Sequence, residues 1–230
     1  MISIQHVSKK FLSKSALENV SLELESGKII GLVGENGSGK STTLKLIAGL
    51  NKPTKGTITI NGVPSTHRIA NQVAYLSELD EYYSFYNVGE TIDFHASQFP
   101  DFNKEKAEEI REFMNLDRNA KLKHLSKGNR GRLKIVLTLA REVPVILMDE
   151  PLSGLDPMVR ESIVKGLISF IDLEKQVVLI TTHEIKEIET ILDDVIVIKD
   201  GSIIGHHNVE SLRIEQNMGI VEWMTTIYNR

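Results

Sequence analysis

The chain has 230 residues, of which 41% are hydrophobic and 25% charged, so an intrinsically disordered protein is excluded and one sizeable core is possible. The net charge of −4 argues against nucleic acid as a partner, and the absence of cysteine excludes disulfides and thiolate metal sites. No apolar run approaches the roughly 20 residues that span a bilayer, and no signal-peptide pattern opens the chain, so we expect a cytoplasmic protein that reaches a membrane only through a partner.

Strands dominate the predicted N-terminal part. Residues 2–7 alternate weakly between apolar and polar side chains, and residues 17–24 alternate more clearly, which is typical of strands with one buried face. Residues 28–33 form an apolar run between two glycines, which indicates a strand buried on both faces. The segment at 43–50 repeats its apolar residues at helical spacing and predicts a helix.

The segment between this third strand and the helix fits the phosphate-loop pattern of a glycine, four residues and then Gly-Lys-Ser. It consists of Gly34, Glu35, Asn36, Gly37, Ser38, Gly39, Lys40, Ser41 and Thr42. Backbone N–H groups curl around a phosphate where glycines permit positive φ and carry no Cβ, and the helix that follows offers its positive dipole end. The pattern predicts a nucleotide site in which Lys40 contacts the β- and γ-phosphates and Ser41 binds Mg²⁺.

Phe11, which follows the first strand, has two open interpretations. Lys9 and Lys10 flank it, so it fits an exposed aromatic ring that stacks on an adenine. It fits a residue of the hydrophobic core equally well.

The middle of the chain changes character. Strands are predicted at 55–60, which ends in an Asn-Gly turn, and at 73–76. A dense aromatic run then occupies 80–86, although the chain is only 6% aromatic. Helical periodicity follows in three segments, which span 88–98, 104–116 and 127–142. We therefore predict a helical insertion over about 80–143 in an α/β core.

The core is predicted to resume with a buried strand that ends in Asp149 and Glu150. Asp156 is predicted to cap a helix that has proline at its first position. A buried strand at 177–182 leads to His183, and Asp200-Gly201 predicts a hairpin turn. Apolar residues at helical spacing predict a helix in the C-terminal tail.

These acidic and imidazole groups suit a phosphate site. An aspartate at the end of a core strand holds Mg²⁺ opposite Ser41, and Glu150 is placed to accept a proton from an attacking water. In a parallel sheet, His183 faces the same crevice as the phosphate loop, which favours a bond to the γ-phosphate over a packing role. The other six histidines have no metal-ligand spacing.

A second anion site is predicted near residue 126. Ser126 stands where a helix N-cap belongs, and Gly128 leaves the backbone open in the first turn. Alone, this pattern indicates only one more capped helix.

Taken together, the motifs resemble the ATP-binding subunit of an ABC transporter over nearly the whole chain. The resemblance assigns 34–42 to the first phosphate motif, 126–129 to the signature motif, 145–150 to the magnesium and base motif, 153–156 to the D-loop, His183 to the switch histidine and Phe11 to the adenine-stacking aromatic.

The resemblance implies one ABC ATPase domain over 1–230, with a RecA-like P-loop NTPase core at about 1–79 and 144–207. It implies a helical subdomain at about 80–143 and a C-terminal helix at about 208–229. It also implies ATP and Mg²⁺ as cofactors, and a head-to-tail homodimer or heterodimer with a related ATPase. Each ATP would lie between the phosphate loop of one subunit and the Ser126 and Gly128 region of the other. A transmembrane permease would be the further partner, which would place the chain on the inner face of the cell membrane.

Two residues depart from the family pattern. Glu78 stands where the family usually has a glutamine that touches Mg²⁺; glutamate can still bind the metal, but it adds negative charge beside phosphates. Lys127 replaces the first glycine of the usual Ser-Gly-Gly-Gln signature. Both departures resemble a bacterial exporter branch that moves peptides, antibiotics or amphiphiles.

Two alternatives stay open at this point. The first is an ABC-type ATPase that serves DNA repair or translation without a membrane partner. ATPases of that class usually carry long coiled coils or two tandem ATPase domains. The sequence shows neither feature, so this alternative is disfavoured. The second is a regulatory subunit that binds ATP without hydrolysing it, which the departures at Glu78 and Lys127 permit.

Overall fold

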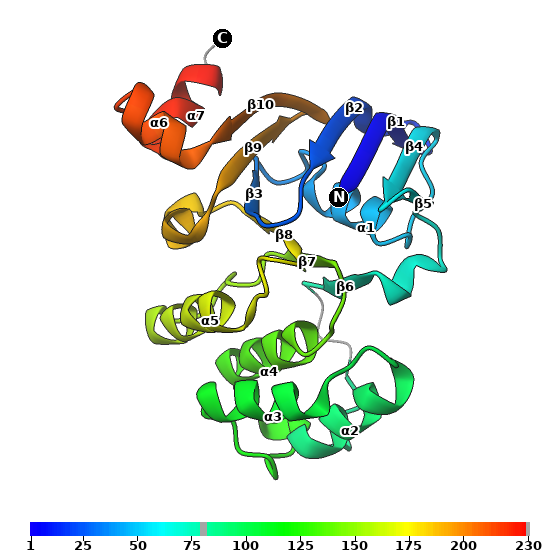
Figure 1. Cartoon of the computed structure of the whole chain (residues 1–230), viewed down its shortest axis with the longest axis vertical. Coiled ribbons are helices and arrows are strands. Elements are labelled where there is room, and N and C mark those ends of the chain that lie inside the picture. Colours follow the sequence, from blue (N-terminus) through cyan, green and yellow to red (C-terminus); the bar gives the residue numbers. More distant parts are fainter. Residues whose placement is uncertain (79–81, 229–230) are drawn as a thin grey trace.

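The computed structural model describes residues 1–78 and 82–228, and its strands form two sheets (Figure 1). The smaller sheet is antiparallel and contains, in spatial order, β2 (Lys14–Leu24), β1 (Ile2–Phe11), β4 (Lys55–Ile60) and β5 (Val63–Pro64). The larger sheet contains β10 (Ser202–Asn208), β9 (Asp194–Lys199), β3 (Ile29–Val33), β8 (Val177–Thr182), β7 (Val145–Asp149) and β6 (Val73–Leu76). Its strands are parallel except for β10, which runs antiparallel to β9. The predicted α/β fold with a mixed sheet and N-terminal antiparallel strands is confirmed.

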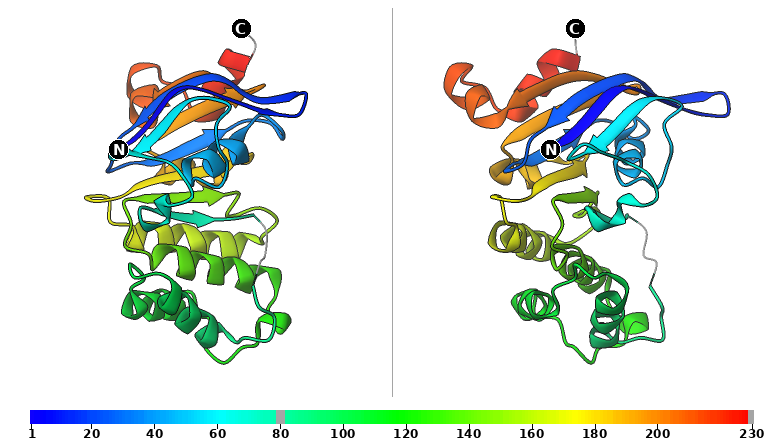
Figure 2. Two further views of the ribbon diagram at one scale, coloured as in Figure 1. Left: turned by 90° about the vertical axis from the view of Figure 1, so that its right-hand side faces the viewer. Right: turned by 45° about the vertical axis from the view of Figure 1, so that its right-hand side comes forward.

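The larger sheet is buried on both faces, as its unbroken apolar strands predict. In β3, Ile30 and Leu32 point into a core shared with the smaller sheet and α1 (Lys40–Ile47). Ile29 and Val33 point to the opposite face of the sheet, because side chains alternate along a strand, and they belong to the core on that face. The alternation of side chains along a strand thus places one core on each side of the sheet that carries the phosphate loop. Figure 2 shows the smaller sheet on one side of this sheet and the helical part of the chain on the other.

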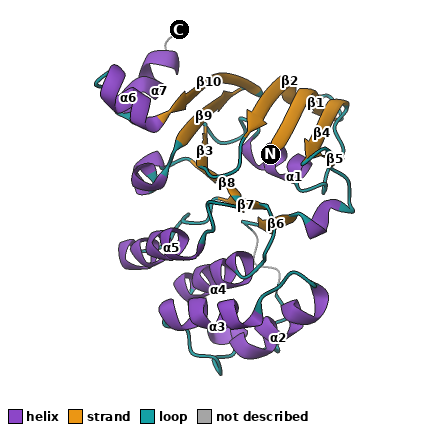
Figure 3. Cartoon of the chain, viewed as in Figure 1, coloured by secondary structure: helices purple, strands orange, loops and turns teal. Residues whose placement is uncertain are grey.

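Helices cover the second face and extend away from it (Figure 3). They are α2 (Val88–Gln98), α3 (Lys104–Phe113), α4 (Lys127–Leu139) and α5 (Pro157–Phe170). The predicted N-caps are confirmed: the Ser126 hydroxyl accepts from the amide of Asn129, and the Asp156 carboxylate accepts from the amide of Val159. The subdomain limits given above stay predictions, and the boundary at 79–80 lies outside the described residues.

Turn chemistry explains how several strands reverse. Asn61 and Gly62 have φ values of 50° and 80°, so both central residues of the β4–β5 hairpin are left-handed, as the Asn-Gly pair predicts. Asp200 and Gly201, with φ of 47° and 79°, turn β9 into β10 in the same way. Both predicted turns are confirmed.

Helix ends differ from the prediction. α3 stops at Phe113 instead of 116, because Asn115 adopts a left-handed φ of 52°. α4 stops at Leu139 instead of 142.

The expected single C-terminal helix is wrong. The tail forms α6 (Val209–Glu215) and α7 (Ile220–Tyr228), because Asn217 adopts a left-handed φ of 47° and Gly219 follows it. Residue 229 of that prediction lies outside the described residues.

A buried histidine gives the fold a pH dependence. His95 on α2 lies among the rings of Tyr82, Phe99 and Phe102, and this burial lowers its pKa below the usual value of 6.5. Because His95 binds a proton at a higher pH in the unfolded chain than in the folded protein, protonation favours unfolding. The stability that neutral His95 contributes is therefore fully present above pH 6.5 and is lost as the pH falls below that value. The free energy of unfolding should therefore decrease between pH 7.5 and 5.5, by at most about 1.4 kcal/mol per pH unit for this one proton.

Urea unfolding of His95→Phe at both pH values checks the expectation, since the variant should show a smaller pH dependence than the wild type. The exposed His124 provides the control, because His124→Phe should leave the pH dependence unchanged. An equal dependence in the wild type and His95→Phe would contradict the assignment.

Candidate functional site

The phosphate loop lies between the carboxyl end of β3 and the start of α1. Gly37 and Gly39 have φ of 84° and 115°, so both have the left-handed backbone that the pattern predicts. Gly34 does not have a positive φ, contrary to expectation. It is required for a different reason, because a Cβ there would lie 2.2 Å from the carbonyl oxygen of Ile198. Gly34 therefore lets the loop pack closely against β9, whereas Gly37 and Gly39 let its backbone curl.

Lys40, the first residue of α1, is buried inside this loop. Its Nζ donates to the carbonyl oxygens of Gly34 at 2.7 Å and Glu35 at 3.2 Å, and it lies 3.7 Å from Oε1 of Glu150. The buried Lys40 ammonium is thus already positioned to bind an anion, such as a phosphate, inside the curled loop.

Asp149 ends β7 and is buried below the loop. Its Oδ1 accepts hydrogen bonds from the hydroxyls of Ser41 at 2.9 Å and Thr181 at 2.8 Å, and its Oδ2 accepts from the Tyr75 phenol at 3.1 Å. Burial and the nearby Asp149 charge raise the pKa of Tyr75, so this phenol stays protonated and continues to donate. Three strands, β6, β7 and β8, and helix α1 thus fix the position of one carboxylate.

Glu150 and His183 meet beside Asp149. Glu150 has a left-handed φ of 50°, and its amide donates to the Thr181 hydroxyl at 3.0 Å. One carboxylate oxygen lies 2.8 Å from Nδ1 of His183, which follows β8. The parallel strands β7 and β8 therefore bring both residues to the edge of the sheet where β3 delivers the phosphate loop, as the sequence predicts.

These groups surround a cavity of about 560 Å³. The predicted residues that line it are Phe11, Asn36, Gly37, Gly39, Lys40, Ser41, Thr42, Glu78, Glu150 and His183. Phe11 stands half exposed at the end of β1, with Nζ of Lys9 at 4.7 Å from its ring centroid, so the core interpretation of Phe11 is wrong. Ser38 and Asp149 are buried and do not line this cavity, whereas Gly34 and Glu35 line a neighbouring cavity that also contains His183.

Ser126 and Gly128 do not line this cavity, although the sequence assigns them to nucleotide binding. They begin α4 elsewhere, and Lys127 between them places its ammonium beside Gly154, where a Cβ would lie 2.1 Å from Nζ. One copy of the chain therefore presents two separate candidate phosphate sites.

Sequence reasoning missed Tyr75 and Thr181, which hold Asp149, and Lys14 and Ala16, which line the cavity. Ser153, which the resemblance assigns to the D-loop, also lines the cavity. Thr181 lies opposite Asp149 in the β7–β8 register, and a single sequence does not specify that register.

The residues fit Mg²⁺ in their donor chemistry. Ser41 and Asp149 offer a hydroxyl and a carboxylate oxygen side by side, and Mg²⁺ prefers oxygen ligands. Within residues 1–78 and 82–228, no group of three or more acidic, histidine or cysteine side chains forms a protein cage for a metal. A site with few protein ligands is what Mg²⁺ uses when phosphates and water supply the others.

Comparison with known proteins decides the family. The sequence profile described as ABC transporter matches residues 17–153, which is more than half of the chain. The chain belongs to the ABC transporter family. As a member of that family it is an ATP-binding ATPase domain with a P-loop NTPase fold.

Relatives of this ABC domain cover almost its whole length. The uncharacterized ABC transporter ATP-binding protein YcbN of Bacillus subtilis is 31% identical, over 98% of this chain and 75% of its own length. The ABC transporter ATP-binding protein YtrB of the same organism is 29% identical, over 94% of this chain and 74% of its own length.

Solved structures have the same fold as this ABC domain. A structure described as the ATP-binding subunit of an ABC transporter superposes with a TM-score of 0.87 at 23% identity and covers 99% of both chains. The ATP-binding cassette MJ0796, solved as a dimer in a post-hydrolysis state with ADP and Pi, superposes with a TM-score of 0.80 at 25% identity, over 90% of this chain and 98% of its own. No helix among the described residues of this ABC domain is long and apolar enough to cross a membrane.

Proposed function

We propose that this chain is the ATP-hydrolysing subunit of an ABC transporter and powers the movement of a substrate through a separate transmembrane permease. The observation that carries the proposal is the convergence of Lys40, Ser41, Glu150 and His183 on one cavity, with Asp149 directly behind it. A subunit that only senses ATP has no need of a carboxylate placed as a base. This convergence therefore favours hydrolysis over the regulatory alternative.

The reaction is in-line attack of water on the γ-phosphate of ATP. Phe11 stacks on the adenine, while Lys40 and the loop amides offset the negative charge that develops on the transferred phosphoryl group. Glu150 accepts the proton of the attacking water, and His183, 2.8 Å from Glu150, holds the γ-phosphate oxygens. Ser41 and Asp149, with Glu78 on the lining of the same cavity, would hold Mg²⁺, which would supply further charge neutralisation when bound.

Two copies, or this chain and a related ATPase, complete each site. Ser126 and Gly128 lie outside the cavity, and Ser126 caps α4, whose 13 residues contain no acidic side chain. Such a helix start attracts an anion. In a head-to-tail pair it would contact the γ-phosphate held by the other subunit.

The permease docks on the aromatic run that follows Glu78. Residues 80 and 81 of that run lie outside the described residues. Tyr82 and Tyr86 pack against the core, but Tyr83 and Phe85 are 54% and 65% exposed, with ring centroids 5.4 Å apart. Two adjacent exposed rings are a typical protein-binding feature.

Tyr83→Asp with Phe85→Asp should abolish co-isolation with the permease and leave the ATPase activity of the purified protein within about twofold, because surface substitutions rarely perturb a fold. The exposed Ile214 on α6 provides the matched control, since Ile214→Asp should retain the permease. Normal recruitment of the double variant would place the dock elsewhere.

The departures at Glu78 and Lys127 support a further assignment to the exporter branch, with peptides, antibiotics or amphiphiles as substrates. ATP-dependent accumulation of such a compound inside inverted vesicles that carry the complex would indicate export.

Affinity isolation of the tagged chain from membranes, followed by an ATPase assay, tests the whole proposal. We expect a transmembrane protein in the isolate and hydrolysis by the purified chain. Isolation with ribosomes or DNA and no membrane protein would favour the non-transport alternative. ATP binding without turnover would favour the regulatory one.

A further inference from the structure

Lys134 connects two parts of the molecule that are far apart in sequence. It lies two turns into α4, and its Nζ donates to the carbonyl oxygens of Ser77 at 3.1 Å and Glu78 at 2.8 Å. These two residues directly follow β6, the edge strand of the larger sheet. Charge-assisted bonds of this kind are the strongest class of hydrogen bond, so one side chain ties the helix to the segment that leaves the sheet.

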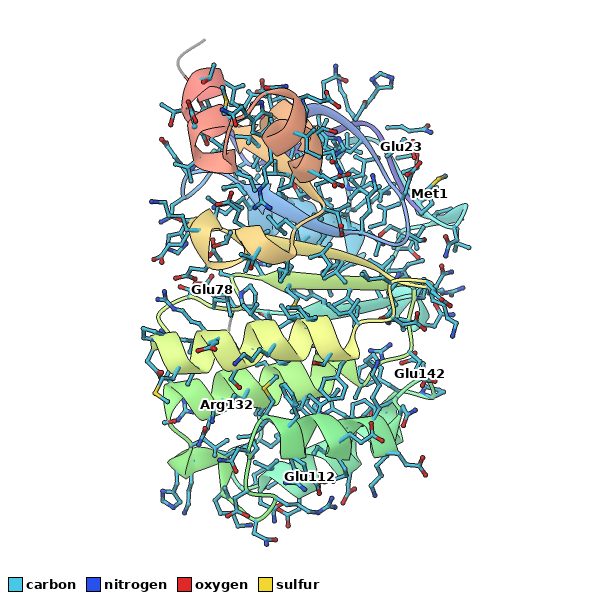
Figure 4. The ribbon with its side chains drawn as sticks, turned by 60° about the vertical axis from the view of Figure 1, so that its left-hand side comes forward. Met1, Glu23, Glu78, Glu112, Arg132 and Glu142 are labelled. Atoms are coloured by element: carbon cyan, nitrogen blue, oxygen red, sulfur yellow. The ribbon has the colours of Figure 1, made fainter. Side chains whose placement is uncertain are left out.

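The tied segment carries a cavity residue. Glu78 lines the same cavity as Lys40, Ser41 and Glu150. Figure 4 shows Glu78 at the junction between the strands and the helices below them. Because Lys134 holds the backbone of Glu78, the position of the Glu78 carboxylate depends on the position of α4.

The other end of α4 is the second candidate phosphate site. Ser126 caps the helix eight residues before Lys134, which is about 12 Å along a helix. A helix of this length moves as a rigid rod, so a displacement at Ser126 reaches Lys134 and through it Glu78. The described contacts thus join the two phosphate sites of one chain.

We propose that Lys134 is a positioning residue that holds Glu78 in the nucleotide cavity and couples the Ser126 end of α4 to it. This proposal rests on the proposed function, in which Ser126 contacts the nucleotide of a second copy. Lys134 touches neither nucleotide itself. Its effect is on the geometry of Glu78, and hence on turnover and not on the first binding of ATP by the phosphate loop.

The test compares Lys134→Met, which removes the donors, with Lys134→Arg, which keeps them. Lys134→Met should lower kcat about 10- to 100-fold, the usual cost of losing a partner that orients an active-site group, with the Kd for ATP unchanged. Lys134→Arg should restore most of the activity. The exposed Lys165 of α5 gives the control, since Lys165→Met removes a helix lysine without touching this segment.

A double-mutant cycle separates positioning from general damage. If Lys134 acts through Glu78, then Lys134→Met should have little further effect on kcat in a Glu78→Ala background. Additive losses would overturn the proposal, as would normal turnover by Lys134→Met or a parallel loss of ATP affinity. If Lys134→Met does not fold, Lys134→Gln, which keeps a neutral donor, takes its place in the cycle.

Amide hydrogen exchange gives a readout independent of catalysis. Addition of a non-hydrolysable ATP analogue to the wild type should change exchange in both the 73–78 segment and the first turns of α4, and Lys134→Met should uncouple the two. Equal responses in the wild type and the variant would refute the coupling. An inactive wild type that still shows the coupled response would refute the proposed hydrolysis and leave the role of Lys134 supported.

Discussion

Glu150→Gln should bind ATP as tightly as the wild type and hydrolyse it about 10²–10⁴-fold more slowly, the usual cost of losing a general base. The substitution preserves the size of the side chain and its reach to His183, which lies 2.8 Å away. It also preserves the backbone bond to Thr181. What it removes is the capacity to accept a proton. Because hydrolysis opens the nucleotide-bound pair in this mechanism, the variant should accumulate as an ATP-bound dimer.

Three measurements check this expectation: steady-state ATPase rate, ATP affinity by calorimetry, and size in solution with and without ATP. Glu184→Gln is the matched control, because this neighbouring carboxylate lies 3.5 Å from the other ring nitrogen of His183 but outside the cavity lining. It should keep near wild-type turnover. A normal rate in Glu150→Gln, or an equal loss in both variants, would show that the proton goes elsewhere.

Local signals explain what the sequence alone made predictable. The phosphate loop, the acidic strand end and His183 each combine a short motif with a buried strand, and parallel strands bring their carboxyl ends to one edge. The same holds for the Asn61-Gly62 turn and the caps at Ser126 and Asp156, because each depends on residues within three positions. Such features need no knowledge of the rest of the fold.

Contacts between distant segments were not predictable in this way. Tyr75 bonds Asp149 across 74 residues, and Lys134 bonds Ser77 across 57. Neither bond leaves a motif, since a tyrosine in a strand and a lysine on a helix are ordinary. Gly34 illustrates a subtler limit: the pattern demanded a glycine, but the approach of β9, and not φ, is the reason. The register of the sheet decides these details, and a single sequence does not specify it.

Lys40→Ala should weaken ATP binding by about 30- to 5,000-fold, since truncating one partner of a buried charged contact typically costs about 2–5 kcal/mol. The loss should fall on affinity before it falls on turnover. Lys40 is the buried cation inside the loop curl, with bonds to the carbonyls of Gly34 and Glu35 that hold it toward the cavity. Calorimetric titration with a non-hydrolysable analogue measures the effect without interference from hydrolysis.

Lys45→Ala separates the loss of this particular cation from the loss of any cation on α1. Lys45 lies in the last turn of the same helix and outside the cavity lining, so its removal should change ATP affinity less than twofold. Lys40 also lies 3.7 Å from Glu150, and its removal leaves that largely buried carboxylate with one cation fewer. Thermal unfolding of both variants therefore accompanies the titration. Unchanged ATP affinity in a folded Lys40→Ala would contradict a phosphate role for the loop and, with it, the placement of the γ-phosphate beside Glu150.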